Sequence, residues 1–354
     1  MPKIGIGVIG LGRVASWGHF PAYLQMEDKV KIAALCDSNS VALEEKARLC
    51  TARTYTNYED LLNDPDVDAV DICLPHHLHG KIGLAALNSG KHLLIEKPFT
   101  ATLAEAESLI DSARKKNLKI MVAENTRFIN AYEITRKFLD EEGIGKINVV
   151  RTLLAGNSPA MSYTTNWRTN VSESGGGAIF DAAVHSFYLL EWMAGRINSM
   201  NVTIDEAGHA TGMDGSACGI LNFNSGTIGH FTVTVTSEIP WTERLELFGS
   251  KGTIIVDMLS ERPVQVFWRK ESSDRSDMQN EQGLGDREAY WREPFFPHSA
   301  TAWKAASVRK EVYHFVECIL ENKTPLVSGE DGKRGLSLVL AAYESARTGK
   351  EVKV

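Results

Sequence analysis

Short apolar segments alternate with segments of helical spacing over the first 123 residues, and this alternation constrains the fold more than any other feature. The pattern predicts strands at residues 4–9, 31–36, 69–73, 92–95 and 119–122. It predicts helices between them, at residues 14–26, 40–49, 78–89 and 103–116. Apolar strands that alternate with helices pair in parallel, and helices cover both faces of their sheet. We therefore expect an α/β fold whose N-terminal part is a doubly wound parallel sheet.

The turn after the first predicted strand reads VIGLGRVA, which places two glycines and an alanine at G-x-G-x-x-A spacing. Gly10 permits a tight turn, Gly12 lets a pyrophosphate approach the backbone, and Ala15 allows close packing of helix on strand. Arg13 and Val14 begin the helix, whose N-terminus attracts phosphates. A glycine-rich turn that binds no ligand can have the same sequence, so the motif indicates a dinucleotide site only where the surrounding strands and helices support it.

An acid at the end of the next predicted strand supplies that context. Asp37 follows the glycine turn by about 20 residues, where a carboxylate accepts hydrogen bonds from the adenosine ribose hydroxyls. The alternative is that Asp37 caps the following helix. A carboxylate there repels a 2′-phosphate, which favours NAD, whereas Arg13 is placed to reach a 2′-phosphate. We therefore expect a dinucleotide site for NAD, with NADP as the open alternative.

The segment HLLIEKPFT, residues 92 to 100, ends an apolar strand directly in an acid, a lysine and a proline. Ligands of a doubly wound sheet bind outside the carboxyl ends of its strands, so Lys97 faces the edge where the nicotinamide should lie. A lysine there donates hydrogen bonds to a substrate oxygen. Pro98 restricts Lys97 to extended conformations. A solvated lysine at a strand end is the alternative.

The segment SGGGAIFDAAVHSFYLLEWM, residues 174 to 193, combines three glycines with a strongly apolar helix. Asp181 and His185 are four residues apart and therefore share one helix face. Two ionisable side chains in so apolar a helix require a structural or functional explanation, because a buried charge without a partner destabilises the fold. A structural Asp–His pair is one explanation, and a catalytic pair that works with Lys97 is the other.

Composition narrows the class of protein. The net charge of −7 and the pI of about 5.9 argue against a nucleic-acid surface. No apolar run approaches the roughly 20 residues of a membrane helix, and the first ten residues lack the features of a signal peptide. The five cysteines include no C-x-x-C pair, so we expect reduced, mostly buried thiols in a cytoplasmic protein.

Together these segments resemble the Gfo/Idh/MocA family of oxidoreductases, whose members are similar to glucose–fructose oxidoreductase and inositol 2-dehydrogenase. The resemblance spans the whole chain. Its motifs are GVIGLGRVA, the EKP of residues 96–98, the GGG…DAAVH segment, NFNSGTIGHFTVT, LELFGSKGTIIVD and the closing residues 327–354. It implies a Rossmann domain at residues 1–125. It also implies an α+β substrate and oligomerisation domain at residues 126–354, with an open, mostly antiparallel sheet and a C-terminal helix that can pack back near the first domain.

The resemblance also implies an activity, which is hydride transfer between a secondary alcohol of a sugar, glycoside or cyclitol and NAD(P). Lys97 matches the family's active-site lysine, His185 its acid–base histidine and Asp181 its substrate-binding acid. In this assignment His185 accepts the hydroxyl proton, and the positive charge of Lys97 favours the neutral, accepting imidazole. Glu96 then belongs with Lys97 to the cofactor side of the site.

Further candidates surround this centre. Pro75 and His79 in LPHHLHG fit the family's P-x-x-x-H on the cofactor side, and we expect no metal there because no cysteine or acid lies at ligand spacing. The other candidates are expected on the substrate side or beside the glycine turn, and they are Asn125, Arg127, Trp167, Arg168, Trp17 and His19. Arg168 contacts either substrate or a surface ion pair, and Trp17 equally fits an apolar helix face.

The second half raises the question of partners. Residues 268–299 are polar and then aromatic, and their second part fits a lid over the pocket or a subunit contact. The alternating strand HFTVTVTS exposes a sheet face that needs a cover, so we expect a homodimer or homotetramer formed through the C-terminal sheet.

Two other functions stay open at this point. The first is an enzyme whose tightly bound NAD is recycled, as in glycoside 3-oxidation, sugar–sugar oxidoreduction or NAD-assisted glycosidic cleavage. The second is a non-catalytic regulator that binds NAD as a signal. The presence of Lys97, Asp181 and His185 favours an enzyme over the regulator.

Overall fold

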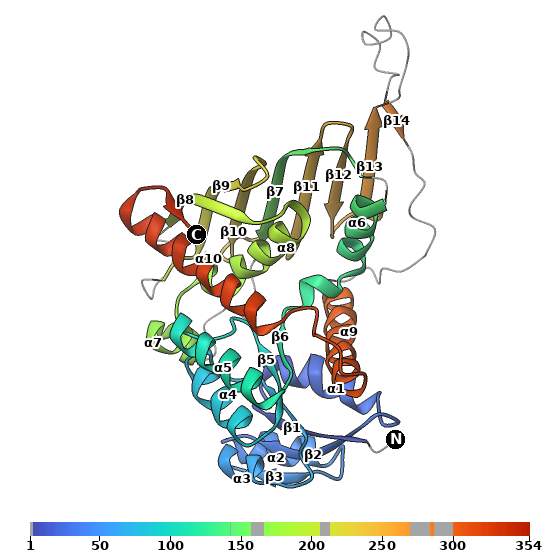
Figure 1. Cartoon of the computed structure of the whole chain (residues 1–354), viewed down its shortest axis with the longest axis vertical. Helices are drawn as coiled ribbons and strands as arrows, with labels where there is room; N and C mark the ends of the chain where they lie inside the picture. The colour runs from blue at the N-terminus through green and yellow to red at the C-terminus, as the bar shows by residue number, and fades with distance from the viewer. Residues whose placement is uncertain (1–2, 142, 157–165, 206–212, 270–283, 287–299) are drawn as a thin grey trace, which may run out of the picture. The chain divides into compact units, whose positions relative to one another are not determined.

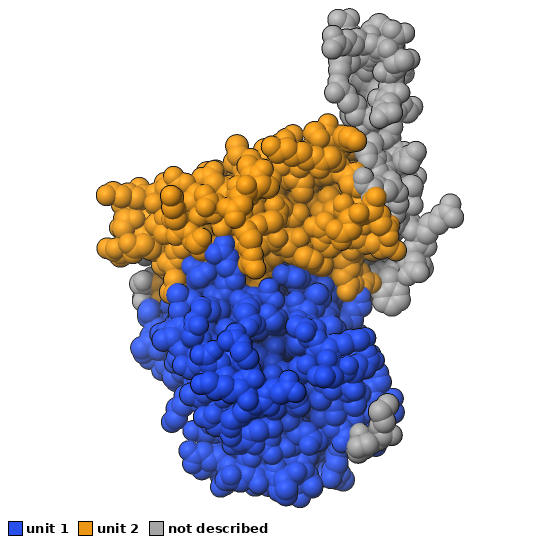
Figure 2. Space-filling model, in the orientation of Figure 1, with its two compact units in different colours: residues 1–128, 165–175, 304–337 blue, residues 129–164, 176–303, 338–354 orange. Residues whose placement is uncertain are grey.

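The computed structural model describes residues 3–141, 143–156, 166–205, 213–269, 284–286 and 300–354. These residues form two compact units, coloured separately in Figure 2. Unit 1 comprises Met1–Phe128, Thr165–Gly175 and Lys304–Ser337, and unit 2 comprises Ile129–Thr164, Gly176–Trp303 and Leu338–Val354. Both units therefore contain segments from distant parts of the sequence. The domain division at residues 125 and 126 stays a prediction.

Unit 1 is built on a parallel sheet of six strands in the part of the chain that is described. The strands are β1 (Ile4–Ile9), β2 (Val30–Cys36), β3 (Arg53–Tyr55), β4 (Ala69–Ile72), β5 (His92–Glu96) and β6 (Ile120–Ala123). Their spatial order is β3-β2-β1-β4-β5-β6, and every neighbouring pair is parallel. The order reverses between β1 and β4, which is the topological switch point of a Rossmann fold. The predicted doubly wound sheet is confirmed.

Helices cover both faces of this sheet (Figure 1). They include η1 (Ala15–His19), α1 (Phe20–Leu24), α2 (Ser40–Ala47), α3 (Tyr58–Leu62), η2 (His76–Leu78), α4 (His79–Asn88) and α5 (Leu103–Lys116). The remaining segments of the unit add η3 (Asn125–Phe128), η4 (Asn166–Thr169), α7 (Val171–Ser174), most of α9 (Ala300–Leu320) and the start of α10 (Gly329–Thr348). The sequence pattern missed β3 and α3, because each is short and β3 is largely exposed.

Unit 2 contains a sheet of nine strands among the described residues. They are β7 (Ile147–Ala155), β8 (Ile197–Asp205), β9 (Ser216–Phe223), β10 (Ile228–Thr234), β11 (Thr242–Gly249), β12 (Gly252–Asp257), β13 (Val264–Arg269), β14 (Leu284–Asp286) and β15 (Val352–Lys353). Their order is β14-β13-β12-β11-β7-β10-β9-β8-β15, and the pairing is antiparallel except between β7 and β10. The predicted open, mostly antiparallel sheet is confirmed.

One face of this sheet is covered by helices of the same unit, which are α6 (Asn130–Glu141), η5 (Ile179–Ala183), α8 (Val184–Ala194) and the end of α10 (Figure 1). Phe187 on α8 meets Phe231 on β10 edge to face, with ring centroids 5.0 Å apart. The alternate residues of β9 and β10 point away from the helices, and Ile220 and Ile228 are about half exposed there. The sheet therefore has one apolar core face and one open face.

Other expectations concern the cysteines, membrane helices and the segment 268–299. All five cysteines are free, and Cys36 and Cys73 are buried in or beside their strands, as predicted. The helices that the structure describes are all too short or too polar to cross a bilayer. Most of residues 268–299 lie outside the described part of the chain, apart from the end of β13 and β14.

Candidate active site

The glycine turn between β1 and η1 shows two different uses of glycine. Gly10 has φ +90°, and a Cβ there would lie 2.3 Å from the carbonyl oxygen of Cys73 at the end of β4. Gly12 is exposed, and a Cβ there would meet no atom within 4 Å. Gly10 therefore lets two strand ends approach each other. Gly12 leaves an open backbone surface at the start of a helix, which is the cradle that a pyrophosphate needs.

Asp37 is fixed beside this turn. Its Oδ2 accepts the backbone N–H of Leu11 at 2.7 Å, and its Oδ1 accepts the N–H of Asn39 at 2.8 Å. The cap of α2 is Asn39, whose side chain accepts the N–H groups of Val41 and Ala42, so the capping alternative for Asp37 does not apply. The half-exposed carboxylate and the open turn fit the ribose and phosphates of a dinucleotide.

Lys97 follows β5 directly and joins Pro98 through a cis peptide bond. Its backbone N–H donates to Glu96 Oε2 at 3.1 Å, and both side chains are half-buried. Because β5 is a parallel strand beside β4, Lys97 lies at the carboxyl edge of the sheet, where ligands of this fold bind. The structure therefore places Lys97 on the same sheet edge as the glycine turn and Asp37.

His79 contacts two loops at this edge. Its Nδ1 lies 2.8 Å from the carbonyl oxygen of Pro98, and its Nε2 lies 2.9 Å from that of Leu74. Burial lowers the pKa of His79, so the ring is neutral and donates from one nitrogen at a time. Pro75 precedes η2 in the same loop. His79 therefore holds the cis-proline loop against the turn that follows β4.

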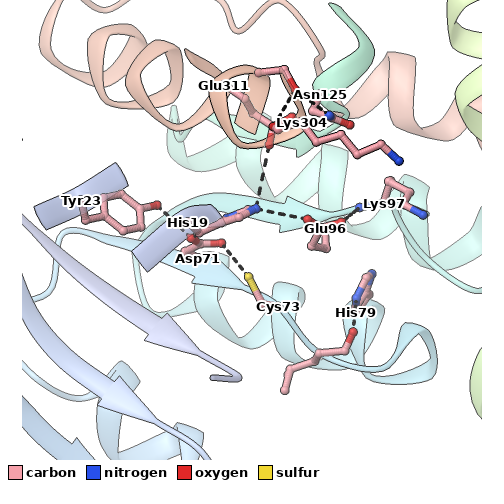
Figure 3. Close-up of polar contacts among 12 residues, drawn as sticks. His19, Tyr23, Asp71, Cys73, His79, Glu96, Lys97, Asn125, Lys304 and Glu311 are labelled. Atoms are coloured by element: carbon pink, nitrogen blue, oxygen red, sulfur yellow. Dashed lines mark hydrogen bonds and ion pairs between the residues drawn. The ribbon is translucent and has the colours of Figure 1, made fainter. Parts of the chain in front are cut away.

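A buried polar cluster lies behind Glu96 (Figure 3). Two pairs connect the sheet to His19, with Nδ1 lying 2.9 Å from Asp71 Oδ2 and Nε2 lying 3.2 Å from Glu96 Oε1. Tyr23 donates its hydroxyl to the same Asp71 oxygen at 3.0 Å. Glu311, on α9, lies 3.9 Å from His19 Nε2. The ring of His19 has no exposed surface, so it contacts Glu96 from the protein interior and does not face a ligand.

Three members of this region have the spacing of a metal site. The donor atoms of His19, Asp71 and Cys73 lie within 4.8 Å of one another. Hydrogen bonds explain the proximity, because Asp71 accepts from His19 and, at 3.5 Å, from the Cys73 thiol. Burial raises the pKa of Cys73, which keeps it a thiol and a poor ligand. The absence of a resident metal stays a prediction.

Two further histidines of LPHHLHG hold the segment that carries Trp167. His76 Nδ1 lies 2.7 Å from the carbonyl oxygen of Ser174, and His77 Nδ1 lies 3.2 Å from that of Glu173. The ring of His76 also meets Trp167 edge on, with centroids 4.9 Å apart. The guanidinium of Arg168 stacks 4.2 Å from the same indole ring. The helical turn η4 is therefore docked on η2 within unit 1.

Asn125 and Arg127 lie in η3, directly after β6. The Asn125 amide donates to the hydroxyl of Ser307 on α9 at 2.8 Å, and both candidate side chains are half-buried. They belong to the same carboxyl edge of the parallel sheet as Lys97.

In unit 2, a brace fixes the glycine turn that leads into η5. The carboxylate of Asp214 accepts the N–H of Gly177 at 3.0 Å and of Ile179 at 2.7 Å. Tyr343, on α10, donates its hydroxyl to Asp214 at 2.8 Å. A Cβ on Gly176 would lie 2.2 Å from that hydroxyl, and one on Gly177 would lie 2.1 Å from the Asp214 carbonyl. The glycines are therefore needed because Asp214 and Tyr343 pack so closely on the turn.

Asp181 and His185 follow this turn on η5 and α8. Both are half-buried, whereas the residues before, between and after them from Ile179 to Leu190 are buried. The helix therefore presents these two ionisable side chains on its accessible face and embeds the rest. The sequence predicted the pair, but it gave no sign of the π-helical turn over Ile179–Ala183 in which Asp181 lies.

The comparisons with known proteins identify the family. Residues 4–124 match the oxidoreductase family model for the NAD-binding Rossmann fold, and residues 136–354 match the model for its C-terminal alpha/beta domain. The chain belongs to the Gfo/Idh/MocA oxidoreductase family. Its Rossmann sheet is accordingly an NAD-binding one, and the open turn at Gly12 and the fixed Asp37 fit that cofactor.

Relatives and solved structures of this Gfo/Idh/MocA chain cover nearly all or all of its length. The myo-inositol 2-dehydrogenase of Thermotoga maritima is 28% identical over 99% of this chain and 98% of its own. The levoglucosan dehydrogenase of Pseudarthrobacter phenanthrenivorans is 24% identical over 97% of this chain and 95% of its own. A solved structure of levoglucosan dehydrogenase in complex with NADH and levoglucosan superimposes with a TM-score of 0.84, at 25% identity and full coverage of both chains.

The sequence missed several residues that shape the site of this Gfo/Idh/MocA protein. Asp71 is hidden inside an apolar strand, and Glu311, Asp214 and Tyr343 are far from the motifs they support. The signal that could have found Asp71 is an acid in a strand that is otherwise fully apolar, since a buried carboxylate needs partners. The specific roles of the candidate site residues stay predictions.

Proposed function

We propose that this protein is an NAD-dependent dehydrogenase that oxidises a secondary alcohol of a sugar, glycoside or cyclitol, or catalyses the reverse reduction. The observation that carries the proposal is the partial exposure of Asp181 and His185, whereas the other residues from Ile179 to Leu190 are buried. Two relatives are named as dehydrogenases of myo-inositol and of levoglucosan, and these names support the proposed substrate class.

In the proposed reaction, bound NAD supplies the hydride acceptor. The imidazole of His185 accepts the proton of the reacting hydroxyl, and Asp181 binds a neighbouring hydroxyl through its carboxylate. Lys97 donates a hydrogen bond from its ammonium group to the reacting oxygen, which stabilises charge as it develops there. Gly12, Arg13, Val14, Asp37, Pro75, His79 and Glu96 are proposed on the cofactor side. Asn125, Arg127, Trp167 and Arg168 are proposed on the substrate side.

The experiment that tests this function measures NADH formation with a panel of inositols, free sugars, anhydrosugars and glycosides. Loss of the general base in His185→Ala should lower kcat by about 10²- to 10⁴-fold and leave NAD affinity unchanged. His230→Ala is the matched control, because His230 is a half-buried histidine on β10 and should turn over like the wild type. Equal rates in His185→Ala and the wild type would contradict the assignment.

The recycling enzyme is distinguished by the state of the cofactor. Protein that purifies with NAD bound, and converts a glycoside without releasing NADH, would support recycling over a dehydrogenase that exchanges its cofactor. Ordinary NAD affinity with no turnover in any assay would support the regulator.

Oligomeric state, compartment and cofactor preference complete the proposal. The half-exposed Ile220 and Ile228 on the open sheet face support a homodimer or homotetramer. The five free cysteines support a reducing compartment such as the cytoplasm. The carboxylate of Asp37 supports NAD over NADP.

A further inference from the structure

Glu96 and Lys97 are adjacent residues of opposite charge at the end of β5, and the structure provides a separate partner for the acid. One Glu96 oxygen lies 3.2 Å from His19 Nε2, and the other accepts the Lys97 backbone N–H at 3.1 Å. His19 in turn lies 2.9 Å from Asp71, which also accepts the hydroxyl of Tyr23. Figure 3 shows the chain of contacts running from Tyr23 through Asp71 and His19 to Glu96.

The charges around His19 make it a cation. Both ring nitrogens face carboxylate oxygens, and only the doubly protonated ring donates to both. Burial, the largest single effect, would lower the pKa of His19, but the charge of Asp71 and the further interactions with Asp71 and Cys73 together raise that pKa well above its ordinary value. Burial also raises the pKa of Glu311 well above its ordinary value, which favours its uncharged form. Burial likewise raises the pKa values of the Cys73 thiol and the Tyr23 phenol, which favours their neutral forms.

We propose that His19 is a positioning residue, a buried imidazolium that holds the Glu96 carboxylate toward the protein interior and keeps it from pairing with the Lys97 ammonium. The proposal deepens the proposed function, because it concerns the lysine that meets the reacting oxygen. Asp71 and Tyr23 fix the ring from the other side, so the imidazolium cannot follow Glu96 outward. Loss of the charge at His19 releases Glu96, which then competes with the substrate for the ammonium group.

The first test asks for the protonation state of His19 by nuclear magnetic resonance of the full-length protein labelled with ¹⁵N-histidine. The His19 resonances, assigned through their backbone connections, should show both ring nitrogens protonated at pH 8, where an ordinary histidine with a pKa of about 6.5 is neutral. A neutral tautomer of His19 at the same pH would overturn the proposal.

The second test measures how fast Lys97 reacts with acetic anhydride, as the acetylated fraction of its peptide in a mass spectrum. In His19→Gln the released Glu96 should stabilise the charged amine and slow acetylation about tenfold or more. His92→Gln is the matched control, because His92 begins the same strand and should leave the Lys97 rate unchanged. An unchanged rate in folded His19→Gln would overturn the proposal.

A double-mutant comparison isolates the route. In a Glu96→Gln background, His19→Gln should change the Lys97 acetylation rate no further, because the released carboxylate is absent. A second slowing in this background would show that His19 acts by another route and would overturn the proposal. None of these measurements needs a substrate, so they are independent of whether the dehydrogenase proposal holds.

Discussion

At the scale of the residue, Gly10 and Gly12 lie in the same turn but are glycines for different structural reasons. Gly10 has a positive φ and lies against the Cys73 carbonyl, so a side chain there conflicts with the fold itself. Gly12 has open space around its missing Cβ, so a side chain there conflicts only with a ligand. The same turn therefore contains one glycine that the fold requires and one that the fold does not require and that we propose serves cofactor binding.

Alanine substitutions should separate these two requirements. Gly12→Ala should change the free energy of unfolding by less than about 0.5 kcal/mol. The added methyl group should weaken NAD binding at least about tenfold, because it occupies the surface that the pyrophosphate approaches. Gly10→Ala should lower stability by about 1–3 kcal/mol through backbone strain alone.

Thermal unfolding and NADH titration of the two variants test this prediction. A Gly12→Ala protein that is as unstable as Gly10→Ala would mean that Gly12 also serves the fold. Normal NADH affinity in a stable Gly12→Ala protein would place the phosphates elsewhere.

Residues that end apolar strands were predictable, and residues that support them from a distance were not. The positions of Lys97 and Asp37 could be predicted because each follows a strand of a parallel sheet, and ligands of such a sheet bind at the carboxyl ends of its strands. The contact of His19 with Glu96 depends on the packing of η1 against β5, which sequence spacing does not encode. Another neighbour of His19, Glu311, comes from a helix close to the opposite end of the chain.

At the scale of the element, the start of η5 and α8 depends on α10. The turn at Gly177 receives Asp214 from the loop before β9 and Tyr343 from α10. Burial raises the pKa of Asp214, while hydrogen bonds from Ile179, Tyr343 and Gly177 oppose that rise. Three segments of unit 2 thus determine where the helix with Asp181 and His185 begins.

Removing one hydroxyl group from this brace should be measurable. Tyr343→Phe loses a hydrogen bond to the Asp214 carboxylate, which should lower the free energy of unfolding by about 1–3 kcal/mol. We also expect a lower kcat, because the first turn of the helix becomes less fixed.

Tyr313→Phe is the control, since its hydroxyl donates to the Gln25 carbonyl on an exposed surface of unit 1. Its loss should change the free energy of unfolding by less than about 0.5 kcal/mol. Equal denaturation midpoints for Tyr343→Phe and the wild type would refute the claim that the Tyr343 hydroxyl stabilises this turn.

The periodicity of the sequence predicted the long elements and missed details of local backbone geometry. In residues 174–193 the sequence predicted three glycines followed by an apolar helix, whereas the first turn of that helix, Ile179–Ala183, is π-helical. A π-helical turn arises from tertiary packing and leaves the apolar pattern unchanged. The glycines signalled a close approach, but only the structure identifies Asp214 and Tyr343 as the groups that approach.

At the scale of the whole molecule, the open face of the nine-stranded sheet predicts self-association. Ile220 and Ile228 are about half exposed on β9 and β10, and both strands bury their alternate residues on the other face. Light scattering should therefore give the mass of a dimer or tetramer. Ile220→Lys with Ile228→Lys should shift that mass toward the monomer, whereas charges at the exposed Val41 and Leu49 of unit 1 should not. A monomeric wild type would refute this arrangement.

The buried ionisable groups also predict how stability depends on pH. Burial lowers the pKa values of His79 and His92, so the folded protein disfavours their charged forms. These histidines bind protons more readily in the unfolded chain, and they make stability fall as the pH drops below about 6.5. His19 and Glu311 have raised pKa values, so the folded state retains their protons longer than the unfolded state does. Their contribution is complete at low pH and is lost as the pH rises.

The free energy of unfolding above pH 6.5 should therefore depend on His19. Above pH 6.5 the one proton that folded His19 retains should contribute about 1.4 kcal/mol per pH unit to the loss of wild-type stability, and Glu311 adds to that loss. His19→Gln should be less stable at pH 6.5 and should lose this part of the slope, so the two curves converge as the pH rises. His92→Gln should keep the full alkaline slope, because the lowered pKa of His92 affects only the acid side. Urea unfolding between pH 6.5 and 9 measures the three slopes, and parallel curves for His19→Gln and the wild type would show that His19 is neutral in the folded protein.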